Sequence, residues 1–170
     1  MKQSIITSFV LIASILVITS CGKYNLETIS KFNVRLAAVG GFAAEQVNIE
    51  IEQVLVTYED TTWVPLNTPR QVYNLLDYSN GLDTLIALGN IPATSIVRKM
   101  KLILGTNHSL KFNGKLVALA NSPSQREMIF VVEKKLNRYI ETVTLQFNPA
   151  QSIKFDNDGI YRFSPVATLK

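Results

Sequence analysis

Apolar and polar residues alternate along most of the chain after residue 31, which is the pattern of half-buried β-strands. Residues 32–36 and 47–51 alternate strictly. After residue 51 the alternation shifts by one position near Glu52–Gln53. One extra residue in the strand would explain this shift, and such an insertion is a β-bulge. Further segments with strand character are 72–76, 85–88, 96–104, 110–112, 115–119, 128–136, 139–147, 153–155 and 160–163.

Turn residues separate these segments. Asn80–Gly81, Asn113–Gly114 and Asp158–Gly159 each pair Asn or Asp with Gly, which accept the positive φ angles of tight turns. Many short strands at regular spacing predict an all-β sandwich or barrel. Of these two, we expect an antiparallel β-sandwich of transthyretin-like or immunoglobulin-like type.

Two segments depart from the regular pattern. The arm Trp63–Leu66 follows a turn at residues 59–62, and its Pro65 limits it to an edge or irregular strand. In residues 71–78, Val72, Leu75 and Leu76 have the spacing of a short helix. A short strand fits this segment about equally well.

The N-terminus has a different character. One cation, Lys2, precedes an apolar stretch over residues 5–18, and Ile18-Thr19-Ser20-Cys21 follows it. This is the layout of a secretory leader, and the stretch is shorter than the roughly 20 residues that span a bilayer as a helix. The last four residues resemble the lipobox of bacterial lipoproteins, which implies cleavage after residue 20 and acylation, including palmitate-type chains, of Cys21.

The chain is therefore expected to have three parts: a leader over residues 1–20, a lipidated tether over 21–30, and one β-sandwich domain over 31–170. Loss of the leader lowers the formal charge from +4 to +3, too mild an imbalance to indicate nucleic-acid binding. Lys23, two positions after Cys21, argues by resemblance against retention in the inner membrane. We therefore expect a lipid-anchored protein of the bacterial envelope, most simply in the outer membrane.

A series of landmarks follows in a recognisable order along the chain: Val47–Ile51, Trp63–Leu66, Tyr73–Leu76, Asn80–Gly81, Leu88–Ala93, Arg98–Leu102, Val143–Ile153 and Tyr161–Val166. This order resembles a bacterial lipoprotein domain catalogued as domain of unknown function 4382, over roughly residues 32–166. The family has no established activity, so the resemblance implies an envelope lipoprotein with a β-sandwich fold and no catalytic residues.

Candidate chemistry is sparse. His108 is the only histidine, and no Gly-x-Ser-x-Gly motif accompanies it, so it is interpreted as a surface-loop residue. One cysteine and one histidine cannot make the usual zinc site. In Asp156-Asn157-Asp158-Gly159 the glycine stands fourth rather than sixth, which favours a turn over a calcium loop. We expect neither a metal nor a cofactor.

Carboxylates and aromatic residues leave two alternatives open. Paired acids could act on a glycoside, although Glu50 and Glu52 lie two apart on one strand and are expected on its solvated face. Aromatic residues could form a sugar-stacking platform, but at alternating strand positions they more often pack in the core. The acids considered are Glu50, Glu52, Glu133 and Glu141, and the aromatic residues are Trp63, Tyr58, Tyr73, Tyr78, Tyr139 and Tyr161.

The leading hypothesis is a lipid-anchored, non-catalytic binding or assembly module. Its expected partners are the membrane, through the anchor, and an envelope protein or glycan. The alternatives are a hydrolase using His108 or an acidic pair, and a carbohydrate-binding module with an aromatic platform. A compact cleft holding His108 or two facing carboxylates would favour the hydrolase, and carboxylates spread over a solvated face would favour the module. Coplanar exposed rings would favour carbohydrate binding.

Overall fold

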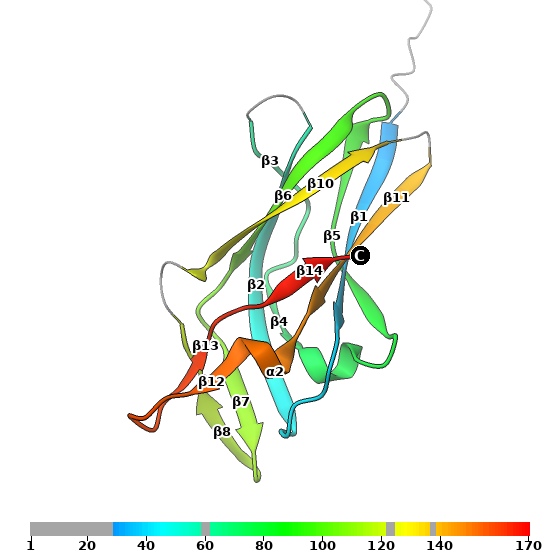
Figure 1. Ribbon diagram of the computed structural model, residues 1–170. Helices are drawn as coiled ribbons and strands as arrows, with labels where there is room; N and C mark the ends of the chain where they lie inside the picture. The colour runs from blue at the N-terminus through cyan, green and yellow to red at the C-terminus, as the bar shows by residue number, and fades with distance from the viewer. Residues whose placement is uncertain (1–28, 59–61, 122–124, 137–138) are drawn as a thin grey trace, which may run out of the picture.

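A computed structural model describes residues 29–58, 62–121, 125–136 and 139–170. Most of these residues are in strands, which pack as two main sheets with a small third sheet at one end (Figure 1). The elements are β1 (Ile29–Ala38), β2 (Gln46–Thr57), β3 (Val64–Pro65), β4 (Gln71–Asn74), the 3-10 helix η1 (Leu75–Tyr78), β5 (Asp83–Pro92), β6 (Ile96–Leu104), β7 (Ser109–Phe112), β8 (Lys115–Ala118), β9 (Ala120–Asn121), β10 (Glu127–Lys135), β11 (Ile140–Phe147), α2 (Pro149–Ser152), β12 (Ile153–Phe155), β13 (Tyr161–Phe163) and β14 (Ala167–Leu169).

The first sheet has the order β14-β11-β1-β5, and the second has the order β10-β6-β2-β7-β8 with β3 and β4 also paired to β2. The third sheet is β12-β13-β9. The all-β sandwich predicted from the alternation is confirmed. Most pairs are antiparallel, and β1 with β11 and β13 with β9 are the parallel pairs among the described strands.

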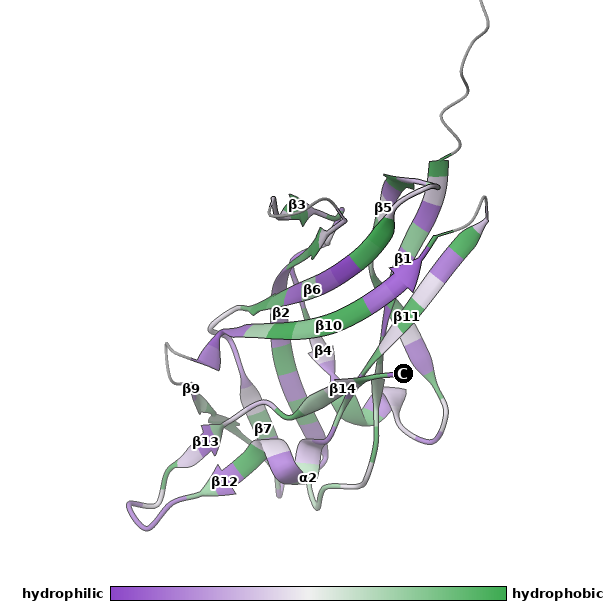
Figure 2. Cartoon of the chain, turned by 45° about the horizontal axis from the view of Figure 1, so that its top comes forward, coloured by the Kyte–Doolittle hydropathy of each residue, from purple (hydrophilic) through white to green (hydrophobic). Residues whose placement is uncertain are grey.

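The core lies between the two main sheets, and the period of two explains how it forms. Along β1, Phe32, Val34 and Leu36 are fully buried while the residues between them are partly exposed. The hydropathy colours show the same alternation of apolar and polar bands along β1 and β2 (Figure 2). Met100 and Leu102 of β6 contribute to the same core from the second sheet.

Local predictions from the sequence agree with the structure in three places. The β2–β6 register shifts between Ile51 and Gln53, which confirms the bulge. Asn80 and Asn113 have φ angles of 56° and 48°, and the glycine after each is also at positive φ, as tight Asn-Gly turns require. The segment 71–78, left open between strand and helix, contains both: β4 and then η1.

The chain crosses between sheets at α2, where a polar side chain holds each end. Asn148 caps the helix by accepting a hydrogen bond from the Gln151 N–H, and Pro149 occupies the first helical position. Ser152 is fully buried; its hydroxyl donates to the Asn148 carbonyl and accepts from the Val166 N–H, each within 2.8 Å. This serine joins α2 to the segment before β14.

The molecule has two distinct ends. β1 and β11 begin at the upper end in Figure 1, whereas the β7–β8 and β12–β13 hairpins project from the lower end. Among the described residues, no helix has the length and apolar character needed to cross a bilayer. The predicted leader and Cys21 lie outside the described residues.

Candidate functional site

A buried carboxylate, Glu50 of β2, lies where the loop after β6 crosses that strand. Its side chain is 6% exposed. Oε1 accepts a hydrogen bond from Arg70 Nε at 2.8 Å, and Oε2 accepts from the backbone N–H groups of Thr106 and Asn107 at 2.8 and 2.9 Å. Because three donors surround it, the ionised carboxylate is stable although it is shielded from water.

His108 ends the same loop and is only 3% exposed. Its Nδ1 accepts a hydrogen bond from the backbone N–H of Glu50 at 3.1 Å, so the neutral ring carries its proton on Nε2. The side-chain amide of Asn121 lies 3.2 Å from Nε2. If the Asn121 amide oxygen faces the ring, it accepts a hydrogen bond from the Nε2–H group. If the amide nitrogen faces the ring, the buried Oδ1 of Asn121 has no hydrogen-bond partner among the described residues.

The same imidazole packs against Phe163, with the ring centroids 4.8 Å apart. Since Phe163 belongs to β13 and Asn121 to β9, His108 joins the second sheet to the third. We call Glu50, Arg70, Thr106, Asn107 and His108 the Glu50 cluster.

The surroundings shift both titratable groups away from their ordinary behaviour. The hydrogen bond from Arg70, followed by the one from the Asn107 N–H, lowers the pKa of Glu50 from 4.5 to about 2. Burial lowers the pKa of His108 below its usual 6.5; the Gly105 carbonyl and the Glu50 carboxylate act in the opposite direction. At neutral pH the cluster therefore contains an ionised glutamate and an uncharged histidine.

Gly105 makes the close approach of the loop possible. A Cβ atom at this position would lie 2.0 Å from Glu50 Oε2, far inside van der Waals contact. The Gly105 N–H also donates to the Glu50 carbonyl at 2.9 Å. A glycine is therefore required here for the space that the carboxylate occupies.

Two predictions about these residues are wrong. His108 is buried rather than on the surface, because residues of the third sheet cover its ring. Glu50 is buried rather than solvated, because the 105–108 loop and Arg70 cover the outer side of β2 at that point. Glu52 is closer to the expectation: its side chain is 33% exposed and contacts Arg126 at 2.9 Å.

Each of the four candidate acids contacts a cationic side chain. Glu50 and Glu52 share Arg70, at 2.8 and 3.7 Å. Glu133 of β10 contacts Arg98 at 3.8 Å, and Glu141 of β11 contacts Lys134 at 3.2 Å. A general acid needs a raised pKa to hold its proton at neutral pH, and the pKa of Glu50 moves in the opposite direction. Within the described chain, no hydroxyl group is hydrogen-bonded to His108.

The aromatic platform, an alternative to core packing, would need Trp63 and the tyrosines to lie together. Lys101 Nζ lies 4.9 Å from the centroid of the Trp63 ring and covers one of its faces. Tyr73 is 2% exposed, and its ring meets that of Tyr78 edge to face. Tyr139 precedes the start of β11, whereas Tyr161 belongs to the third sheet, which follows the end of that strand. Tyr73, Tyr139 and Tyr161 therefore do not lie together on one exposed face.

The acidic segment before β13 forms the predicted turn. Gly159 is at φ 78°, and the Asp156 and Asp158 carboxylates both bind the Arg162 guanidinium, the second at 2.6 Å. In the part of the chain that the structure describes, no three His, Cys, Asp or Glu side chains are grouped to hold a metal ion.

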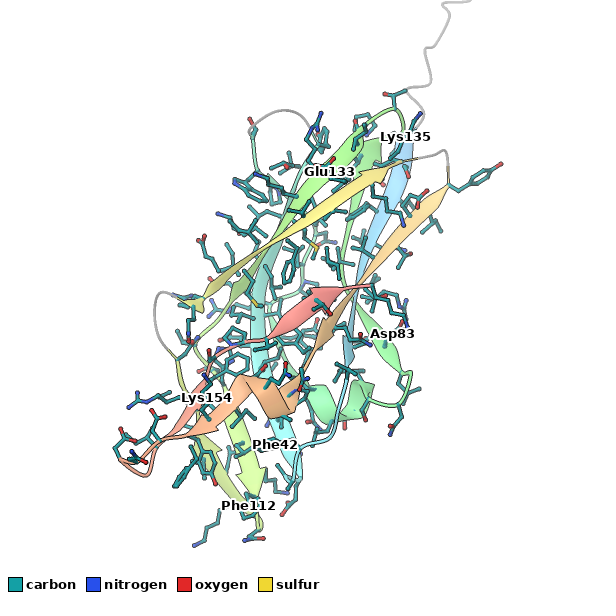
Figure 3. The ribbon with its side chains drawn as sticks, viewed as in Figure 1. Phe42, Asp83, Phe112, Glu133, Lys135 and Lys154 are labelled. Atoms are coloured by element: carbon teal, nitrogen blue, oxygen red, sulfur yellow. The ribbon has the colours of Figure 1, made fainter. Side chains whose placement is uncertain are left out.

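Apolar side chains are exposed at the lower end of the molecule. Phe112 and Leu116 of the β7–β8 hairpin are 41% and 66% exposed, and Phe155 and Ile160 of the β12–β13 hairpin are 63% and 43% exposed. The hairpins project from the same end, where Figure 3 labels Phe112. The β7–β8 register pairs Leu116 with Lys111 and Phe112 with Lys115, so Phe112 and Leu116 point to opposite faces of their hairpin. We call these four residues, which share one end of the molecule, the distal patch. Its apolar character suits a contact with another molecule.

The sequence did not predict the Glu50 cluster or the distal patch, because alternation does not tell which positions other segments cover. Ile153 and Phe155 lie on one face of β12, and alternation predicts that both are buried, yet only Ile153 is. The pattern gives the face of a strand but does not say where the core ends. A weak indication of the Glu50 cluster was present: acids at alternate positions of a strand, with a glycine-containing loop, Gly105–Ser109, elsewhere in the chain.

Comparisons with known proteins give one match. A family model described as "Domain of unknown function (DUF4382)" matches residues 30–165, nearly the range over which the sequence resembles that domain. No curated protein matches the chain, and no solved structure matches it.

Proposed function

The chain belongs to the DUF4382 family, and we propose that it is a lipid-anchored, non-catalytic protein of the bacterial cell envelope that acts as a binding or assembly module. The observation that carries this proposal is the distal patch, four exposed apolar side chains on two hairpins at the end opposite the start of β1. A protein anchored before β1 would present this end away from its membrane.

The anchor is proposed at Cys21 because an apolar stretch and small residues precede it. Acylation there gives membrane attachment without a spanning helix, since two acyl chains suffice for stable anchoring. Lys23 favours the outer membrane, with the domain facing the periplasm.

The Glu50 cluster supports a non-catalytic role. Its carboxylate is already bound by three donors, and both ring nitrogens of His108 face groups of the scaffold. A catalytic base needs a free position toward a substrate, whereas these atoms hold the loop after β6 against β2.

The chemistry of the distal patch favours a protein partner over a glycan. Leu116 and Ile160 are aliphatic, and the rings of Phe155 and Tyr161 are inclined at 48° with centroids 4.6 Å apart. Sugar stacking uses open, flat ring faces, while aliphatic and aromatic side chains together are typical of the apolar centre of a protein interface.

Site-specific photocrosslinking in living bacteria tests the proposal. A benzophenone amino acid replaces Phe155 in the full chain, and Val131, which is 69% exposed on β10, gives a matched control position. We expect one discrete protein adduct from position 155 and none from 131. In parallel, labelling with radioactive palmitate should mark the wild-type protein and be lost in Cys21→Ser.

Three results would contradict the proposal. Equal crosslinking from both positions would show that the patch has no special role. Absence of the palmitate label from the wild-type protein would show that it has no lipid anchor. A crosslinked adduct with glycan in place of protein would favour carbohydrate binding.

A further inference from the structure

The end of the domain at which β1 begins has an apolar surface of its own. Ile29 is 55% exposed, Tyr139 is 78% exposed and Ile140 is 59% exposed. Together with Lys31 they line a shallow hollow of about 480 Å³. The β1–β11 register places Lys31 directly beside Ile140. The hollow therefore combines apolar side chains with a cation.

The second sheet contributes the same combination at this end. Lys135, the last residue of β10, pairs with Ile96, the first residue of β6, which is 37% exposed. Figure 3 places Lys135 at the upper end of the molecule, where β1 begins. We call Ile29, Lys31, Ile96, Lys135, Tyr139 and Ile140 the N-terminal tip.

The charge of the tip is positive. Two acids of the neighbouring described strands already have cationic partners: Glu133 contacts Arg98 and Glu141 contacts Lys134. Within the described residues, Lys31 and Lys135 form no ion pair. Exposed apolar side chains beside unpaired cations suit the interface of an anionic bilayer, where the former enter the acyl boundary and the latter meet phosphate groups.

The length of the tether leads to the same surface. Cys21 precedes Ile29 by eight residues, and a chain of that length reaches at most about 29 Å even when fully extended. We propose that the N-terminal tip docks on the phospholipid surface to which Cys21 is attached, and so fixes the domain with its distal patch away from the membrane. This inference rests on the proposed lipid anchor.

The two ends can be compared with single fluorescent probes on the full chain. Acylation blocks the thiol of Cys21, so Ile140→Cys creates the one thiol available for an environment-sensitive dye. Leu116→Cys, at a position 66% exposed in the distal patch, is the matched control, and Ile29→Cys is a second tip position should Ile140→Cys fold poorly. Each protein is reconstituted in vesicles of phosphatidylethanolamine and phosphatidylglycerol.

We expect the emission of the tip probe to shift to shorter wavelength and to be quenched several-fold more by nitroxide-labelled lipid than that of the control. Replacing Lys31 or Lys135 by Gln should lower the ratio of docked to undocked protein about fivefold each, because each cation near an anionic surface contributes that much.

Three outcomes would overturn the inference, and they are distinguishable. An acylated protein whose two probes are equally hydrated retains its anchor but has no docked tip. A tip probe that is shielded but not quenched by nitroxide lipid is covered by protein, such as a second copy of this chain. A reactive thiol at Cys21 would show that acylation is absent, and the proposed anchor would then fail together with the docked tip.

Discussion

The Glu50 cluster and the distal patch reverse the usual distribution of side chains in opposite ways. The cluster encloses a carboxylate and an imidazole inside the fold, and each has hydrogen-bond partners within the chain. The patch exposes four apolar side chains that the described chain leaves uncovered. The difference indicates that the cluster stabilises this domain, whereas the patch is the surface that we propose for contact with another molecule. Mutations in the first should change stability, and mutations in the second should change binding.

The strongest test of this contrast is Glu50→Ala. The substitution removes the acceptor of three hydrogen bonds, two of them from backbone N–H groups, and we expect it to lower the free energy of unfolding by about 3 kcal/mol. Glu52→Ala is the matched control, because Glu52 lies on the same strand and binds arginine at a more exposed position; its cost should be at most about 1 kcal/mol. Chemical denaturation measures both, and equal losses would contradict a special role for Glu50.

Acidification should remove a similar amount of stability. The pKa of Glu50 is about 2 in the folded protein and near 4.5 in the unfolded chain. Its contribution is therefore complete above pH 4.5 and is lost as the pH falls toward 2, by about 3 kcal/mol in all. The lowered pKa of His108 acts in the same direction, beginning as the pH falls below 6.5. Denaturation at a series of pH values gives the free energy of unfolding as a function of pH. Below pH 4.5 this free energy should change much less with pH in Glu50→Ala than in the wild-type protein. An equal pH dependence in the two proteins would refute the assignment.

Gly105→Ala tests the same cluster from the loop side. Its new Cβ cannot coexist with the Glu50 carboxylate at 2.0 Å, so the loop or the carboxylate must move, at a cost of about 2 kcal/mol. Because both substitutions disrupt one set of contacts, the double variant with Glu50→Ala should lose little more than Glu50→Ala alone. Additive losses in a denaturation series would mean that Gly105 matters for another reason.

The alternation of side chains predicts the strands of this fold well because burial on one face is a local property. The bulge in β2 and the Asn-Gly turns follow from the same local chemistry. The Glu50 cluster does not, because Glu50 and Thr106 are far apart in sequence and only the packing of β2 against β6 brings them together. The left-handed backbone of Glu133 also could not be predicted, since nothing in its local sequence, Val132-Glu133-Lys134, favours positive φ.

Glu133 lies at a register shift between β10 and β6, with φ 45°. A residue with a side chain is strained there, so Glu133→Gly should raise the free energy of unfolding by about 1 kcal/mol. Glu127→Gly provides the control on the same strand: its φ is not positive, its exposure is similar, and glycine there should cost about 0.5 to 1 kcal/mol. Thermal melting that moves in the same direction for both variants would contradict this account of the bulge.

The smallest expected effect on stability is at the distal patch, and it completes the comparison. Leu116→Ser removes a side chain that is 66% exposed, and we expect the free energy of unfolding to change by less than about 0.5 kcal/mol. The same substitution should weaken the crosslinked adduct formed from position 155, because the proposed partner contacts both hairpins. Val131→Ser, at the exposed face of β10, should leave both stability and adduct unchanged. If Leu116→Ser instead destabilised the domain by as much as Glu50→Ala, the patch would be part of the core, and its exposed apolar side chains would give no reason to expect a partner.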